Sequence, residues 1–72
     1  MDSALLKYFM AKFGDDSKDL AAYLGISEPW LSQKINEKNG AEFKLSEIRK
    51  IIKRYKLKSE EVISIFFADY VS

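Results

Sequence analysis

Residues 16–36 have the sequence DSKDLAAYLGISEPWLSQKIN, and this stretch decides the fold. Its apolar residues up to Leu24 recur at the spacing of one helical face, and Gly25 follows where a left-handed residue commonly ends a helix. Ser27 is a favourable N-cap for a second helix whose first turn accepts a proline. The pattern predicts two short helices joined by a tight turn, over about residues 16–38.

Three further helices are expected to flank this unit. The first begins after Asp2 or Ser3 and ends at Gly14, and the last begins at a Ser59 N-cap. Between them, after an Asn-Gly break, a clear 3.6-residue apolar period predicts a helix that starts near Leu45. The expected fold is an all-α, compact five-helix domain with the two short helices as its second and third. Its largely buried residues should include Leu20, Leu24, Leu31, Ile35, Ile48, Ile51 and Ile52.

The composition limits the possible functions. With 72 residues, of which 47% are hydrophobic and 32% charged, the chain fits one globular domain over residues 1–72. It has no cysteine or histidine, which excludes thiolate zinc sites and Ser-His triads, and its acids are scattered. We therefore expect no enzyme activity, no metal and no cofactor. Without a long apolar run or a secretory signal, we expect no membrane contact and a cytoplasmic location.

The charge is unevenly distributed along the chain. Between Lys44 and Lys58 there are seven basic residues and one acid, Glu47, a net charge of +6. Residues 16–39 hold three lysines against four acids, a net charge of −1. The basic run indicates either a solvated helix face or phosphate contacts, whereas the two-helix unit has the wrong sign for binding a polyanion.

The two-helix segment resembles a known family of regulators. Residues 20–27, LAAYLGIS, and residues 31–36, LSQKIN, are similar to the core pattern of Cro/cI-type helix-turn-helix regulators of temperate phages. Residues 45–51, LSEIRKI, are similar to the fourth helix of that family's five-helix domain. The size of the chain also resembles modulator-of-repression antirepressors of Gram-positive phages. The resemblance implies a transcriptional regulator in the cytoplasm of a host bacterium.

The first functional hypothesis is an antirepressor in the lysis-lysogeny switch. In the family the start and middle of the second short helix read base edges, but here a large ring, Trp30, stands beside the acid Glu28. An aromatic anchor with an acidic and polar rim is typical of a protein interface that complements a basic surface. We expect it to bind the DNA-binding domain of a phage repressor and to block operator binding. The candidate partner-binding residues are Tyr23, Glu28, Pro29, Trp30, Gln33 and Glu37.

The alternative is a Cro-like repressor that binds operator DNA directly. The candidate DNA-contacting residues are Ser17, Ser32, Gln33, Lys34, Asn36 and Lys44. This reading needs a dimer that reaches two half-sites, and the surplus apolar residues Ile63, Phe67 and Tyr70 on the last helix could supply its interface. We favour the antirepressor because of Trp30 and the charge sign, and we expect a monomer or weak dimer.

Overall fold

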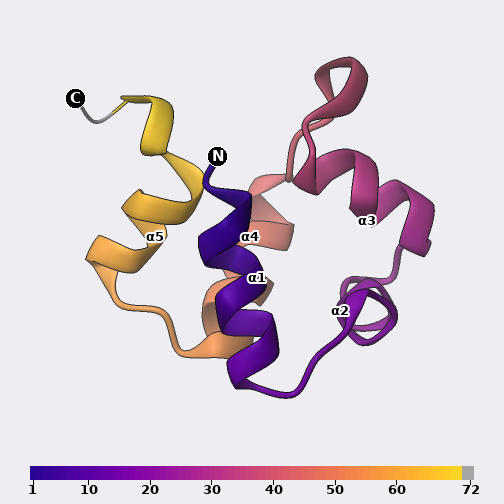
Figure 1. Cartoon of the computed structure of the whole chain (residues 1–72), viewed down its shortest axis with the longest axis horizontal. Coiled ribbons are helices and arrows are strands. Elements are labelled where there is room, and N and C mark those ends of the chain that lie inside the picture. The colour runs from indigo at the N-terminus through magenta and orange to yellow at the C-terminus, as the bar shows by residue number, and fades with distance from the viewer. Residues whose placement is uncertain (71–72) are drawn as a thin grey trace.

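The computed structural model describes residues 1–70, and all regular structure in that range is helical. In Figure 1, α1 runs through the middle of the molecule, with α5 on one side and α2 and α3 on the other. The described part of the chain has no strand, so the predicted all-α five-helix class is confirmed. The elements are α1 (Ser3–Lys12), α2 (Ser17–Leu24), α3 (Glu28–Ile35), the 3₁₀ turn η1 (Lys38–Gly40), α4 (Leu45–Tyr55), α5 (Ser59–Phe66) and the 3₁₀ turn η2 (Ala68–Tyr70).

Local capping fixes the ends of α2 and α3. Asp16 accepts the backbone N–H of Asp19 at 2.9 Å, and Asp19 accepts that of Asp16 at 3.0 Å. Gly25 ends α2 with a φ of +75°, a conformation that strains any residue with a Cβ. Ser27 then accepts the N–H of Trp30 at 3.2 Å and starts α3. A turn of residues 25–27 therefore joins two helices that pack on each other.

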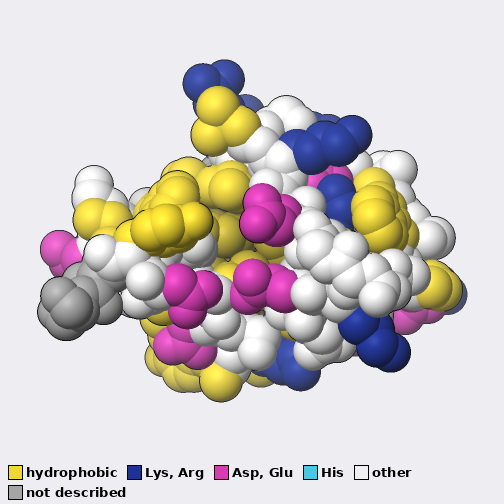
Figure 2. Space-filling model, turned by 90° about the horizontal axis from the view of Figure 1, so that it is seen from above, with side chains coloured by type: hydrophobic (Ala, Val, Ile, Leu, Met, Phe, Trp, Pro, Cys, Tyr) yellow, Lys and Arg dark blue, Asp and Glu magenta, His cyan; other side chains and the backbone are white. Residues whose placement is uncertain are grey.

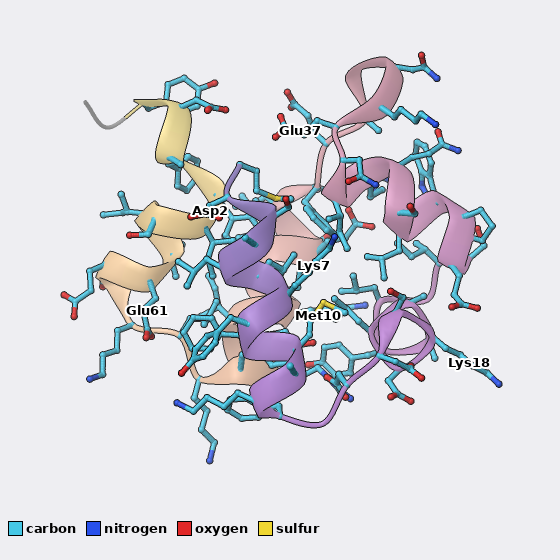
Figure 3. All side chains as sticks on the ribbon, in the orientation of Figure 1. Asp2, Lys7, Met10, Lys18, Glu37 and Glu61 are labelled. Atoms are coloured by element: carbon cyan, nitrogen blue, oxygen red, sulfur yellow. The ribbon has the colours of Figure 1, made fainter. Side chains whose placement is uncertain are left out.

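The core is one cluster that draws on all five helices. Leu31 is fully buried between α2 and the rest of the molecule, and Met10 projects from α1 toward α2 (Figure 3). The prediction of burial is wrong for Ile48 and Ile52, which are only half-buried. The buried residues of the cluster are Leu6, Phe9, Met10, Leu20, Ala21, Leu24, Leu31, Ile35, Ile51, Tyr55, Leu57 and Ile65.

The narrow buried stripe of α4 explains these two exceptions. Ile51 and Tyr55, four residues apart, are buried to 0% and 1% exposure and point at the centre of the core. Ile48 lies one turn earlier and faces a surface pocket instead. Leu45, in the first turn, is 63% exposed. The helical spacing of the apolar residues in α4 was predicted correctly, but only part of this apolar face is buried in the core.

The last helix begins and ends earlier than predicted. Its N-cap is Lys58 rather than Ser59, and the Lys58 N–H donates to Glu61 at 2.7 Å. The helix stops at Phe66, and η2 follows. The expected continuation to Val71 lies outside the described residues. Ile65 is the one residue of α5 that is fully buried. No helix of residues 1–70 is long and apolar enough to cross a membrane.

A polar cluster ties α4 to the loop after α1. Arg54 donates through Nε and Nη2 to the two carboxylate oxygens of Asp15, at 2.6 and 2.8 Å, and the Tyr55 hydroxyl donates to the same carboxylate at 2.9 Å. The Arg54 guanidinium also lies over the Tyr23 ring, 4.5 Å from its centroid. Such a two-pronged, charge-assisted contact fixes geometry as well as adding stability.

Asp15 should make the fold sensitive to acid. The hydrogen bond from Arg54 lowers the Asp15 pKa below its ordinary value of 3.8. As the pH falls, Asp15 is therefore protonated in the unfolded chain at a higher pH than in the folded chain. The contribution of Asp15 is therefore complete at neutral pH and is lost below about pH 4. We expect Asp15→Asn to lower the free energy of unfolding at pH 7 by about 1.5–3 kcal/mol. Urea unfolding from pH 7 to pH 3 should show the two proteins converge, and a constant difference would contradict this role.

Candidate partner-binding surface

The first turn of α3 presents an aromatic ring and an acid to solvent. Trp30 is 41% exposed, so the structure places it outside the core. Glu28 and Pro29 precede it and are exposed as well. The Glu28 carboxylate complements the positive end of the helix dipole, and Pro29 occupies a position where no N–H is needed. The ring is therefore held on a capped helix end rather than on a loose loop.

Lys34 lies beneath Trp30 and anchors it to α4. Its Nζ is 5.1 Å from the centroid of the Trp30 ring and 2.5 Å from Oε1 of Glu47. The Lys34 side chain is only 1% exposed. Lys34 was a candidate DNA-contacting residue, but the structure buries its ammonium group and pairs it with the Glu47 carboxylate, so it is not available to DNA in this structure. Lys34 instead makes a cation–π contact with the Trp30 ring.

Glu47 is a functional neighbour that sequence reasoning missed. Burial raises the Glu47 pKa, but hydrogen bonds from the Lys34 ammonium and the Lys44 backbone N–H lower it by more, and the net value falls below the ordinary one. Glu47 is therefore ionised at neutral pH, and the contact with Lys34 is an ion pair. In the sequence, Glu47 was distinguished only by being the single acidic residue between Lys44 and Lys58.

The other partner-binding candidates on α2 and α3 divide between two neighbourhoods. Gln33 is half-buried one turn after Trp30 on α3, where residues three apart share a face. Tyr23 lies on α2, is half-buried, and has the Arg54 guanidinium over its ring. Lys18, also on α2, points away from the helix into solvent (Figure 3). Trp30 and Gln33 thus form the centre of the candidate surface, and Tyr23 belongs to the polar cluster with Arg54.

Glu37 leaves the helical face on which it was expected. Because α3 ends at Ile35, Glu37 lies beyond the helix in a left-handed conformation with a φ of 51°. Its carboxylate accepts from the amino group of Met1 at 2.8 Å. The expected position of Glu37 beside Trp30 on one helix is therefore wrong, and Glu37 instead borders a pocket on the neighbouring side of Lys34.

The remaining DNA-binding candidates are accessible. Ser32 and Asn36 are exposed on α3, and the Asn36 side chain donates to the Ser32 hydroxyl at 3.3 Å. Ser17, the first residue of α2, and Lys44, just before α4, are exposed too. With Lys34 removed from this set, Lys44 is the only cation in it. Within residues 1–70 no cluster of acids is arranged to hold a metal ion.

No family model, curated protein or solved structure matches the chain. The class that the fold and the surface define is a small all-α protein with an exposed tryptophan on a short capped helix. Its particular function is inferred below from its own residues.

Proposed function

We propose that this chain is a helix-turn-helix regulator of the Cro/cI type that acts as a phage antirepressor. In this proposal it binds the DNA-reading face of a repressor through the surface around Trp30 and so blocks operator binding. The exposed Trp30, seated on buried Lys34, is the observation that carries the proposal. A tryptophan side chain has a large apolar area and few torsions to restrict, so it loses little entropy when a partner buries it and suits an interface anchor.

The backbone around Trp30 supports a helix-turn-helix origin. A turn of residues 25–27 joins α2 to α3, with Gly25 left-handed and Ala21 buried at 2% exposure. A small residue at this place lets two short helices pack closely, as a recognition helix and its supporting helix do. The same backbone frame can present either base-reading or partner-binding side chains.

The charges around α3 favour a protein partner over DNA. Lys34 is neutralised by Glu47, while Glu28, Asp16 and Asp19 are exposed on the two-helix unit. DNA affinity depends on neutralising phosphates, so this surface would repel the duplex. The same acids complement a basic DNA-reading face, and electrostatic attraction would speed encounter with it.

Direct operator binding is the second candidate, and one observation favours it. The outer face of α4 carries Arg49, Lys50 and Lys53, all exposed, which could contact phosphates. Two half-sites would then require a dimer, for which Ile63 and Phe67, 45% and 42% exposed on and just after α5, offer apolar area.

Two titrations separate these functions. The purified chain is mixed with the repressor encoded beside its gene, and separately with the intergenic operator duplex at physiological salt. The antirepressor proposal expects a complex with the repressor that releases operator DNA. Specific binding of the chain alone to the operator near 10⁻⁸ M, with no repressor complex, would overturn it in favour of the Cro-like function.

A further inference from the structure

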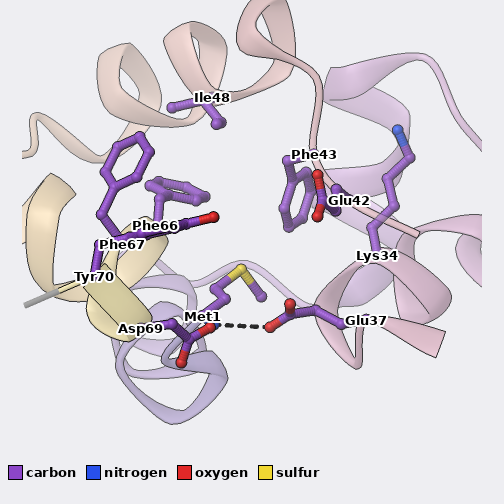
Figure 4. A pocket seen from close by; sticks show the side chains of 10 residues that line it. All are labelled: Met1, Lys34, Glu37, Glu42, Phe43, Ile48, Phe66, Phe67, Asp69 and Tyr70. Carbon is purple, nitrogen blue, oxygen red and sulfur yellow. Dashed lines mark hydrogen bonds and ion pairs between the residues drawn. The ribbon is translucent and has the colours of Figure 1, made fainter. Parts of the chain in front are cut away.

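A surface pocket shares Lys34 with the Trp30 surface. This pocket of about 160 Å³ opens between the segment that leads into α4 on one side and the end of α5 with η2 on the other (Figure 4). Lys34 lines it too, so the pocket adjoins the Trp30 surface but has its own walls. The other lining residues are Met1, Glu37, Glu42, Phe43, Ile48, Phe66, Phe67, Asp69 and Tyr70.

Part of the pocket wall is aromatic and aliphatic. Phe43 meets Phe66 edge to face at 5.9 Å between ring centroids, and Ile48 is half-buried beside them. At the mouth, Phe67 and Tyr70 pack at 6.4 Å and are 42% and 84% exposed. A space of about 160 Å³ has room for a benzene-sized group. One leucine or phenylalanine side chain of a partner therefore matches the space.

The rim of the pocket is acidic. On the face seen in Figure 2, acidic side chains surround a hydrophobic hollow. Glu37 and Asp69 share the Met1 amino group, at 2.8 and 3.0 Å, while Glu42 makes no ion pair within residues 1–70. Three carboxylates thus face one ammonium, an excess of two negative charges, because Lys34 is already paired with Glu47. The rim favours a cationic ligand.

We propose that this pocket docks a basic amphipathic helix of a protein partner. One apolar side chain enters between Phe43 and Phe66, and lysine or arginine side chains on the same helix face Glu42 and its neighbours. This is helix-in-groove recognition, with affinity from apolar burial and selectivity from charge. The pocket does not require that the partner be a repressor, so it stands apart from the function assigned to Trp30.

A designed peptide tests the pocket without knowledge of the partner. The probe is an amphipathic peptide of about four helical turns, with leucines at helical spacing and lysines elsewhere; its control has glutamate in place of every lysine. Titration into the ¹⁵N-labelled chain should give saturable shifts at Phe43, Ile48 and Phe66 with the lysine peptide alone. Equal binding of both peptides, or shifts that avoid the pocket, would overturn the proposal.

Matched variants distinguish binding in the pocket from nonspecific electrostatic attraction and from nonspecific hydrophobic binding. Glu42→Lys should weaken the lysine peptide about tenfold at low salt, whereas Glu60→Lys, the same charge change at the opposite end of α5, should change it less than about twofold. Phe67→Ala should weaken binding, and Tyr8→Ala, which removes a 57% exposed ring from α1, should not. Equal losses within either pair would contradict the pocket.

A second copy of the chain is the competing occupant. In sedimentation experiments, the chain alone should form no dimer that the lysine peptide dissociates. A dimer that is lost in Phe67→Ala and displaced by the lysine peptide would overturn the partner proposal and assign the pocket to self-association. If Trp30→Ala loses repressor binding but still binds the peptide, the Trp30 surface and the pocket act as independent sites.

Discussion

Replacing Lys34 with alanine is expected to lower the free energy of unfolding by about 3 kcal/mol. Removal of one partner from a buried ion pair typically costs about 3–5 kcal/mol, because the other charge stays buried without a counter-ion. Glu47, 6% exposed, would be that charge. We take the low end of this range because Glu47 would still accept the hydrogen bond from the Lys44 N–H. Urea unfolding followed by circular dichroism measures the loss.

A double variant shows whether the cost comes from the unpaired charge. Lys34→Met keeps most of the buried chain, and Glu47→Gln removes the charge while its amide oxygen can still accept the Lys44 N–H. We expect the combined variant to recover most of the stability lost in Lys34→Met alone. If the double variant instead lost as much stability as the two single variants added together, Lys34 and Glu47 would not be coupled. The structural role assigned to Lys34 would then be wrong.

The ends of α2 and the start of α3 could be predicted because their signals are local. Asp16 with Asp19, Gly25, and Ser27 each act within one turn of the chain, and each does in the structure what its position suggested. The burial of Leu31 followed from spacing on the same short helix. Side-chain capping and helical periodicity require no knowledge of the rest of the fold.

The contacts that define the surface could not be predicted in this way. Lys34 meets Glu47 thirteen residues away, and Arg54 meets Asp15 across thirty-nine. A lysine on α3 looks solvent-exposed until the position of α4 is known, and most lysines are exposed. Glu37 was misplaced for another reason: the helix ends two residues before it, and its left-handed backbone is unusual for glutamate.

The candidate partner-binding surface around Trp30 could therefore be predicted in part from the sequence. Trp30 comes directly before buried Leu31, about 100° away around the helix and so toward its outer face, and its ring is exposed. The pocket could not be predicted, because Phe43 and Phe66 come from segments far apart in the sequence that meet only in the folded structure. The partner-binding role of the Trp30 surface remains a prediction, which the following variants test.

Trp30→Ala is expected to weaken repressor binding by more than about 30-fold. Central tryptophans in interfaces commonly contribute above about 2 kcal/mol when truncated, and this one is held in place by Lys34. The fold should lose only about 1 kcal/mol, because a partly exposed ring and one cation–π contact are removed. Calorimetric titration against the repressor gives the first value and thermal unfolding the second. Tyr8→Ala, which removes an exposed ring from α1, is the matched control and should bind as wild type.

Glu28→Lys should act in opposite directions on the two possible partners. It places a positive charge at the start of α3, beside Trp30, so that docking to a basic repressor face becomes about tenfold weaker at low salt. The same lysine can neutralise a phosphate, so any DNA affinity should rise. Glu28→Gln removes the charge without reversing it and should give an intermediate effect on both. If Glu28→Lys instead weakens operator binding and leaves the repressor titration unchanged, α3 reads DNA rather than a protein, and the antirepressor function is excluded.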